Sequence, residues 1–349
     1  MNVTSTVPTL AASAVEFPPH RHSQDEVTAL LAATAGEAFT RFAGSSGVQT
    51  RNLALPLGRY RELSDFTEAN QIYLEVALEL SERALRKALV QADVRPDEVD
   101  VIFSTTVTGL AVPTLDARLA ARVGLRPDVK RVPLFGLGCV AGAAGVARMH
   151  DYLLAYPDQV AVLVAVELCS LTIQWDDDST ANLVASSLFG DGAAAVVAVG
   201  AHRGAPGPQV LATRSRLYPD TEDVMGWQIG ASGFKIVLSA DVPGVAHKYL
   251  GEDVSLFLAE FGLTPEDVGT WVCHPGGPKV IEAVEQVLNL APTALDRTRK
   301  SLRENGNLSS VSVLDVLRAT LAEPPEPGSL GMMIAMGPGF CAELVLLRW

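Results

Sequence analysis

The sequence predicts an α/β fold in which helices are layered on apolar sheets, and three observations support that prediction. Continuous apolar runs at residues 99–106, 159–166 and 193–199 are typical of strands buried on both faces of a sheet. Segments with helical periodicity alternate with these runs, which favours a layered architecture. A repeat with a constant offset of 169 residues further predicts two similar halves.

Two helices can be placed from local signals. The SQDE sequence at residues 23–26 follows a Pro-rich turn and has capping-box spacing, which predicts that a helix begins there. Between residues 70 and 91, apolar side chains recur at helical spacing, which predicts an amphipathic helix. The apolar positions are Ile72, Val76, Leu80, Ala84 and Leu89.

The two halves are recognised by a repeated order of elements. The PDEV sequence at residues 96–99 leads into the first buried strand, and PEDV at residues 265–268 leads into a second one. Each copy follows an amphipathic helix and precedes a small-residue segment that opens another helix. Unrelated βαβ units can also look alike, but a duplication explains the constant offset better. A Gly/Pro-rich stretch at residues 200–208 separates the halves, so we expect domains at residues 1–205 and 206–349.

The composition excludes several classes of protein. Of the 349 residues, 48% are hydrophobic and 19% are charged, which indicates an ordered core. The formal net charge is −13 without a Lys/Arg cluster, so we expect no nucleic-acid partner. The four cysteines form no CxxC pair, so neither a metal site nor a disulfide framework is expected. Neither a signal peptide nor a membrane-spanning run is recognised, so we expect a cytoplasmic protein without membrane insertion.

Cys139 is the candidate nucleophile. It lies in FGLGCVAGAAG, between an apolar strand and a helix of small residues. The unpaired N–H groups at a helix start lower a thiol pKa and favour the thiolate. Gly138 and Gly142 would let the backbone and a substrate approach closely. The alternative is a buried cysteine that packs as a small hydrophobe, and the glycine context favours the nucleophile.

His274 and Asn307 are the candidate partners of this thiol. Among the six histidines, His274 alone directly follows a buried strand and precedes a turn, which places it at a sheet edge where α/β folds keep their sites. Asn307 lies in ENGNLSS at a helix start, where an ordinary N-cap is the alternative. The offset of 169 residues carries Cys139 to position 308, beside Asn307. The repeat therefore predicts that the two helix starts meet.

At these residues the chain resembles the thiolase-fold condensing enzymes, and among them the chalcone synthase-like type III polyketide synthases. The matching blocks run in family order across nearly the whole chain: FGLGCVAGAAG, LFGDGAAA, WVCHPGGPKVIEAVE, ENGNLSS and MGPG. The resemblance implies a thiolase-like fold of two pseudo-duplicated αβαβα halves with layered mixed sheets. The ketoacyl synthase III group also uses Cys, His and Asn, but its His and Asn contexts differ from HPGGP and GNLSS.

The resemblance also implies a mechanism of iterative decarboxylative condensation. Cys139, paired with His274, would attack an acyl-CoA thioester and hold the acyl chain. His274 and Asn307 would donate hydrogen bonds to the thioester carbonyl of malonyl-CoA and stabilise the enolate that forms as carbon dioxide leaves. That carbanion would attack the thioester on Cys139, and repetition followed by cyclisation would give a polyketide. Acyl-CoA and malonyl-CoA are the only small molecules implied, so no cofactor is expected.

Further positions match the family's substrate pocket. Phe189 matches a gatekeeper aromatic between the CoA tunnel and the cavity, and the second gatekeeper position falls near Ile236, which is not aromatic. Val112 matches a residue that reaches into the neighbouring subunit, which implies a homodimer. The positions that match the cavity wall are Val107, Thr108, Cys169, Thr172, Gly337, Pro338 and Gly339.

The CoA site and the starter are expected from the same resemblance. Arg51 matches a phosphate-contacting position, a second basic position falls around Val48, and we expect Gly276 and Gly277 to line the CoA site. Small residues around Gly109 resemble the bacterial branch, which favours a fatty acyl-CoA starter and a pyrone or resorcinol product. The branch that condenses only malonyl units, such as tetrahydroxynaphthalene synthase, stays open because Cys169 matches a cysteine found there. A ketoacyl synthase III-like fatty acid condensing enzyme is a further alternative.

Overall fold

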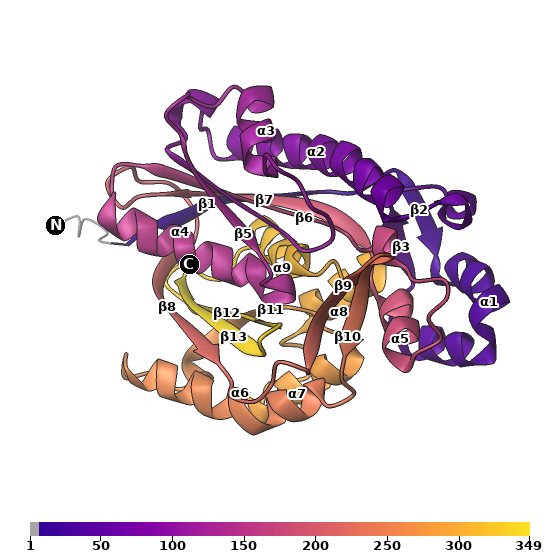
Figure 1. Ribbon diagram of the computed structural model, residues 1–349. Coiled ribbons are helices and arrows are strands. Elements are labelled where there is room, and N and C mark those ends of the chain that lie inside the picture. The colour runs from indigo at the N-terminus through magenta and orange to yellow at the C-terminus, as the bar shows by residue number, and fades with distance from the viewer. Residues whose placement is uncertain (1–6) are drawn as a thin grey trace.

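The computed structural model describes residues 7–349, which form alternating layers of helices and sheet (Figure 1). The layering helices are α2 (Phe66–Gln91), α3 (Leu115–Val123), α4 (Ala141–Ala155), α6 (Val242–Ala259), α7 (Pro278–Val287) and α9 (Ser310–Ala322). Helices α2 and α3 cover one outer face, α4 and α9 lie in the middle, and α6 and α7 cover the opposite outer face. The αβαβα arrangement thus belongs to the whole molecule, and each half contributes one sheet region, one outer layer and one middle helix.

A nine-stranded mixed sheet runs through both halves. Its strands are β1 (Thr9–Glu16), β4 (Val101–Thr106), β5 (Lys130–Phe135), β6 (Val160–Leu168), β7 (Asp191–Val199), β8 (Gln209–Leu217), β11 (Val268–Cys273), β12 (Leu330–Gly337) and β13 (Cys341–Arg348). Their order is β11-β12-β13-β8-β1-β7-β6-β4-β5. The two regions meet where Thr9 of β1 pairs with Gln209 of β8.

The two sheet regions have the same topology, which confirms the predicted layered mixed sheets. In the first half, β7 is antiparallel to β1 and β6, while β6 is parallel to β4. In the second half, β13 is antiparallel to β8 and β12, while β12 is parallel to β11. Strand β5 is an additional edge strand of the first half. The predicted boundary between residues 205 and 206 falls between β7 and β8, and the division into domains there stays a prediction.

The offset of 169 residues is kept in the structure. The 3-10 turns before β4 and β11 span Pro96–Glu98 and Pro265–Asp267, and the middle helices begin at Ala141 and Ser310. Helices α4 and α9 pack against each other at these starts. A side chain on Gly142 would collide with the backbone oxygen of Ser310, so only glycine permits this approach.

The core consists of three clusters of buried apolar side chains between the layers. One cluster lies under α2, the second surrounds α4 and α9, and the third lies under α6 and α7. Strands β6 and β7 are buried along their whole length, as their continuous apolar runs predicted. Strand β4 begins at Val101 rather than at residue 99, because the Val99 N–H donates to Pro96 in the preceding turn.

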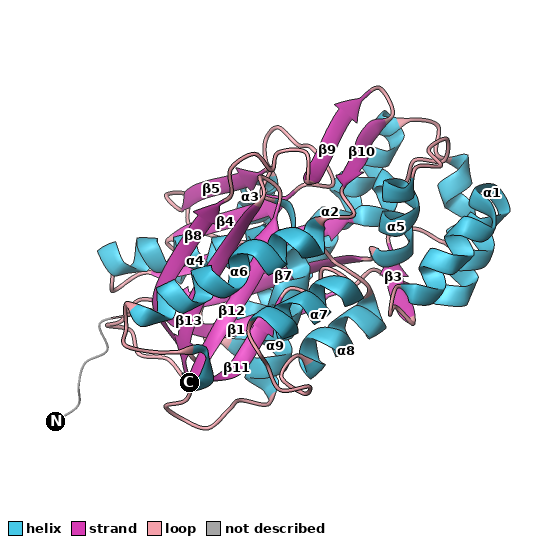
Figure 2. Cartoon of the chain, turned by 90° about the horizontal axis from the view of Figure 1, so that it is seen from below, coloured by secondary structure: helices cyan, strands magenta, loops and turns pink. Residues whose placement is uncertain are grey.

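The remaining elements form a side wall beside the sheet ends (Figure 2). They are β2 (His20–Ser23), α1 (Gln24–Ser45), β3 (Thr50–Leu53), α5 (Thr180–Leu188), β9 (Met225–Gly230), β10 (Gly233–Leu238) and α8 (Asp296–Asn305). Ser23 caps α1 as predicted, because its hydroxyl accepts from the Glu26 N–H while the Glu26 carboxylate accepts from the Ser23 N–H. Helix α5 contacts both α1 and the β9–β10 hairpin. Within residues 7–349, none of the helices combines the length and apolarity needed to cross a membrane.

Candidate active site

Two cavities meet at Cys139. The outer cavity is lined by His274 and Asn307, and the inner cavity by Thr108 and Cys169. Cys139 and Phe189 belong to the walls of both cavities. The predicted nucleophile, its two predicted partners and the predicted gatekeeper position are therefore brought together from both halves of the chain.

Cys139 lies in a short 3-10 turn, Gly138–Val140, directly before α4. Gly138 has a φ of 56°, and a side chain there would collide with Pro338, so glycine is needed at this close approach. The Cys139 thiol is 5% exposed and donates to the Ser309 hydroxyl at 3.6 Å. Burial raises the pKa of the Cys139 thiol to about 12, which is opposite to the lowering expected from the helix start. Desolvation exceeds the effect of the helix start here, and the thiol is protonated at neutral pH.

His274 directly follows β11 and is held by its backbone N–H, which donates to the Ile334 carbonyl at 2.9 Å. Burial lowers the pKa of His274 to about 4, so its imidazole is neutral at physiological pH. Its Nδ1 atom is buried without a hydrogen-bond partner in the described part of the chain. His274 and Cys139 share the outer cavity, but no direct hydrogen bond joins them within residues 7–349.

Asn307 is buried and precisely oriented by its neighbours on both sides of Phe189. Its backbone N–H donates to the Leu188 carbonyl at 2.8 Å, and its carbonyl accepts from the Gly190 N–H at 3.0 Å. The side-chain Oδ1 atom accepts from the Ser309 N–H at 2.8 Å. The Nδ2 group has no recorded partner among the described residues, so it is left to donate into the outer cavity.

Ser309 is a site residue that sequence reasoning missed. Its φ of 52° is unusual for a residue with a side chain, and its hydroxyl lies against the Cys139 sulfur. A strained backbone at such a position is typical of functional sites. The repeat offered the available signal, because the residue equivalent to Cys139 falls between Asn307 and Ser309.

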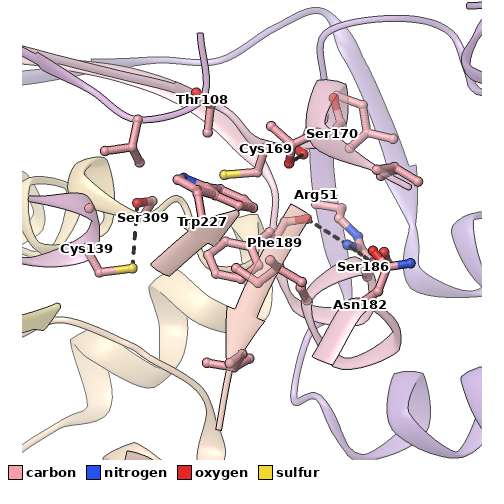
Figure 3. A pocket seen from close by; sticks show the side chains of 18 of the residues that line it. Arg51, Thr108, Cys139, Cys169, Ser170, Asn182, Ser186, Phe189, Trp227 and Ser309 are labelled. Carbon is pink, nitrogen blue, oxygen red and sulfur yellow. Dashed lines mark hydrogen bonds between the residues drawn. The ribbon is translucent and has the colours of Figure 1, made fainter. Parts of the chain in front are cut away.

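Trp227 is a second residue that was missed, and it points into the inner cavity (Figure 3). It pairs across the β9–β10 hairpin with Ile236, which also lines this cavity. The aromatic side chain absent from position 236 is therefore supplied by the opposite strand. Strand pairing in a short hairpin could not be registered from the sequence, so this neighbour was not recognised.

The structure separates the other predicted pocket residues into three groups. Val107, Thr108, Cys169, Thr172 and Pro338 line the inner cavity, and Gly276 and Gly277 line the outer one. Gly337 and Gly339 flank Pro338 without contributing to either lining in the described structure. Val112 lies outside both cavities and is 96% exposed in the single chain.

The small residue at Gly109 does not open a tunnel. A side chain at Gly109 would overlap the ring of Tyr73, which is fully buried and fills this space. The Tyr73 hydroxyl donates to Thr106 at 2.8 Å, which fixes the ring. The expectation that small residues here widen the pocket is therefore wrong at Gly109.

Arg51 does not occupy the position expected of a CoA phosphate ligand. The residue is 2% exposed and borders the inner cavity, not the outer cavity that contains His274. Its guanidinium donates to the carbonyls of Ser186, Ser187 and Phe189 and to the Gln24 side chain, at 2.6–3.2 Å. These contacts cap the end of α5 and hold the backbone of Phe189. The predicted phosphate contact is contradicted, because the donors are already bonded within the protein.

Glu167 is a third residue that was missed. It is fully buried at the end of β6, where its Oε2 atom accepts from the Val107 N–H at 3.0 Å and from the Thr108 hydroxyl at 2.9 Å. Its Oε1 atom accepts from the Ser310 hydroxyl at 2.6 Å. Burial raises the pKa of Glu167 to about 7. This carboxyl joins the wall of the inner cavity to the first residue of α9.

Models of one protein family cover most of the chain. The N-terminal domain of chalcone and stilbene synthases matches residues 38–203, and the C-terminal domain of the same family matches residues 209–349. The chain belongs to the chalcone and stilbene synthase family. Among residues 7–349, no group of three or more His, Cys, Asp or Glu side chains is arranged to hold a metal ion.

Individual members of the chalcone and stilbene synthase family are similar over nearly the whole chain. A 1,3,6,8-tetrahydroxynaphthalene synthase from Streptomyces peucetius subsp. caesius is 54% identical, over 97% of this chain and 93% of that protein. A putative chalcone synthase from Bacillus subtilis (strain 168) is 37% identical, over 86% of each chain. The crystal structure of 1,3,6,8-tetrahydroxynaphthalene synthase from Streptomyces coelicolor A3(2), a bacterial type III polyketide synthase, has a TM-score of 0.94 at 32% identity, covering 98% and 99% of the two chains.

These findings confirm the predicted family and class of reaction. The chain is a type III polyketide synthase with the thiolase-like fold, an acyltransferase that forms carbon–carbon bonds by decarboxylative condensation. The structure adds that its three predicted catalytic residues lie around one cavity.

Proposed function

We propose that this type III polyketide synthase uses malonyl-CoA both as starter and as extender, and forms an aromatic product of the tetrahydroxynaphthalene type. The observation that supports the proposal most strongly is the 54% identity to a 1,3,6,8-tetrahydroxynaphthalene synthase over almost the full length of both chains. The proposal favours the malonyl-only alternative over the fatty acyl-CoA starter that the sequence first suggested.

Loading begins with the neutral pair of Cys139 and His274. The imidazole accepts the thiol proton, and the thiolate attacks the thioester carbonyl of malonyl-CoA. The bond to the CoA sulfur breaks, and CoA leaves as a thiol with the proton from the imidazolium. Both groups are uncharged in the buried cavity, because burial raises the pKa of Cys139 and lowers the pKa of His274. The proton transfer therefore accompanies substrate binding and does not precede it.

Extension uses Asn307 and His274 as hydrogen-bond donors. The thioester oxygen of a second malonyl-CoA accepts from Nδ2 of Asn307 and from the imidazole, and carbon dioxide leaves to give an enolate. The enolate carbon attacks the thioester carbonyl on Cys139, a carbon–carbon bond forms, and the Cys139 thiolate is released. Donors fixed in a water-poor cavity stabilise such an oxyanion far better than water does. The Ser309 N–H fixes the Asn307 amide in the required orientation.

The lining of the inner cavity suits a growing chain of carbonyl groups. Hydroxyl-bearing side chains of Thr108, Ser170, Thr172 and Ser309 line it together with Phe189. Hydroxyls can donate to the many carbonyl oxygens of a poly-β-keto chain. Trp227 occupies space on the Cys169 side of Cys139, as seen in Figure 3, which favours a short starter.

A fatty acyl-CoA starter is the second candidate, and one feature of the inner cavity favours it. The end of the cavity beside α1 is apolar and would accept a hydrocarbon chain. Its apolar lining consists of Val27, Leu30, Leu31, Leu53, Leu57 and Ile173. The choice between the two starters depends on whether an acyl chain can pass Trp227.

We also propose that the enzyme is a homodimer located in the cytoplasm. Val112 is 96% exposed and Leu110 is 39% exposed, in the loop that continues from the inner-cavity residues Val107 and Thr108. Exposed apolar side chains gathered at one loop are typical of a subunit interface. The exposed Phe135 ends the edge strand β5 and adds to the apolar surface. Sedimentation of the purified protein at several concentrations tests the dimer.

The starter is tested by incubating the purified enzyme with malonyl-CoA alone and with a panel of acyl-CoA thioesters, followed by mass spectrometry. Tetrahydroxynaphthalene formed from malonyl-CoA alone supports the main proposal. Pyrones or resorcinols that carry the added acyl group, with no product from malonyl-CoA alone, support the second candidate. Cys139→Ala is the control, since every polyketide product must vanish in this variant.

A further inference from the structure

The phosphates of a CoA thioester require a cation that the predicted positions do not supply. The Arg51 guanidinium is buried and bonded to carbonyl groups, and Val48 is 6% exposed and uncharged. The protein carries a formal net charge of −13, so its average field repels an anionic ligand. A local cation at the outer cavity must therefore offset that repulsion.

Lys279 is the one charged side chain among the described residues that line the outer cavity. It is the second residue of α7 and lies five positions after His274 along the HPGGPK sequence. Its side chain is exposed, and within residues 7–349 its ammonium has no recorded hydrogen bond or ion pair. The cation is thus free to bind a ligand at the solvent end of the cavity that also contains Cys139.

We propose that Lys279 binds the phosphates of CoA thioesters and thereby sets the affinity for the CoA part of the substrate. The inference rests on the proposed use of malonyl-CoA. A thioester carbonyl placed beside Cys139 and His274 leaves the nucleotide end of CoA directed to solvent, past the start of α7. A lysine ammonium is a compact charge that binds phosphate well. Since Lys279 is remote from the reacting atoms, it affects substrate binding and not the rate of condensation.

Direct titration with CoA tests the proposal without any turnover, so its outcome is independent of which polyketide the enzyme makes. We expect Lys279→Met to bind CoA about tenfold more weakly, the loss expected when one charge-assisted hydrogen bond to phosphate is removed. Lys300→Met is the matched control, because Lys300 is exposed on α8 and lies outside both cavities. Pantetheine, which lacks the nucleotide phosphates, should bind Lys279→Met and the parent enzyme equally.

Steady-state kinetics give a second readout. Lys279→Met should raise the KM for malonyl-CoA about tenfold with kcat within twofold of the parent, and leave the malonyl thioester of N-acetylcysteamine unaffected. Unchanged CoA affinity in Lys279→Met, or an equal loss toward pantetheine, overturns the proposal. Arg41→Met covers the nearest competitor, since Arg41 stacks at 5.3 Å over the ring of Phe42 in the outer wall. A loss of CoA affinity in Arg41→Met alone would assign the phosphates to Arg41 and refute the role of Lys279.

Discussion

Helices α4 and α9 occupy equivalent places in the two halves, yet the turns that precede them carry different chemistry. The turn before α4 contains Gly138, with a φ of 56°, followed by Cys139. The turn before α9 contains Asn307 and Ser309, and Ser309 has a φ of 52°. Glycine adopts positive φ at little steric cost, whereas serine is strained there and keeps a hydroxyl against the Cys139 sulfur.

The polar contacts behind the two turns differ in the same way. Glu167 of β6 accepts a hydrogen bond from Ser310, the first residue of α9. The residues at the equivalent positions of the opposite halves, Met336 in β12 and Ala141 in α4, are apolar. The duplication thus repeats backbone positions, while the side chains divide the work. One turn supplies the nucleophile, and the other supplies hydrogen-bond donors and their support.

Cys139→Ala should cause the largest effect and separate the two turns by function. We expect polyketide formation to fall by about 10⁴-fold or more, as for other enzymes that lose a covalent nucleophile. Decarboxylation of malonyl-CoA to acetyl-CoA should persist, because His274 and Asn307 stabilise the enolate without the thiol. Mass spectrometry of both products in one reaction measures this. Loss of decarboxylation together with condensation would mean that the two turns do not act separately.

Asn307→Asp tests the second turn, and we expect condensation to fall by about 10²–10³-fold. The carboxylate can still accept from the Ser309 N–H, so the turn is preserved while the Nδ2 donor is lost. A negative charge beside the forming enolate adds to the cost. Loading of Cys139 should survive, and intact-protein mass spectrometry should detect malonyl bound to the variant. An unloaded variant that is correctly folded would place Asn307 in the loading step as well.

Gly142→Ala tests the contact that brings the two turns together. The added methyl group would overlap the Ser310 carbonyl oxygen and the Val313 side chain, so we expect a loss of about 2–3 kcal/mol in the free energy of unfolding. Urea denaturation measures it. Gly44→Ala is the matched control, because Gly44 lies in helix α1 and has open space around its Cα. Equal stability of the two variants would show that α4 and α9 can move apart freely.

Much of this fold was predictable, because its signals are local or repeated. The apolar runs that became β6 and β7 predicted buried strands, and the capping box at Ser23 predicted the start of α1. The constant offset predicted equivalent helices, and these begin at Ala141 and Ser310. Periodicity could not predict which strands join the halves, since the pairing of β1 with β8 depends on contacts between distant segments.

The site was predictable where chemistry follows from residue type, and not where it follows from packing. Cys139, His274 and Asn307 lie around one cavity, as the repeat and the resemblance predicted. The direction of the Cys139 pKa shift was wrong, because burial cannot be judged from a helix start alone. Arg51 was assigned to phosphate from its charge, yet its guanidinium bonds the carbonyl groups at the end of α5. Trp227 escaped notice because it reaches the cavity only through hairpin pairing.

Glu167→Gln should give the smallest effect, visible as a change in the pH dependence of stability. Burial raises the pKa of Glu167 from 4.5 to about 7, so the folded chain binds this proton more tightly than the unfolded chain. The contribution of Glu167 to stability is therefore complete below pH 4.5 and declines as the pH rises toward about 7. Glutamine cannot ionise, and its amide can donate to the Ser310 hydroxyl while its oxygen accepts from Val107.

Urea denaturation at pH 5 and pH 8 measures this dependence. Between these values the parent enzyme should lose about 2 kcal/mol relative to Glu167→Gln, since one pKa unit corresponds to about 1.4 kcal/mol. Glu75→Gln, at an exposed position on α2, should follow the parent at both values. Parallel behaviour of Glu167→Gln and the parent would mean that Glu167 stays ionised when buried. The polar pair with Ser310 would then be a charged link between the halves, and the apolar counterparts Met336 and Ala141 would differ from it in charge as well as in polarity.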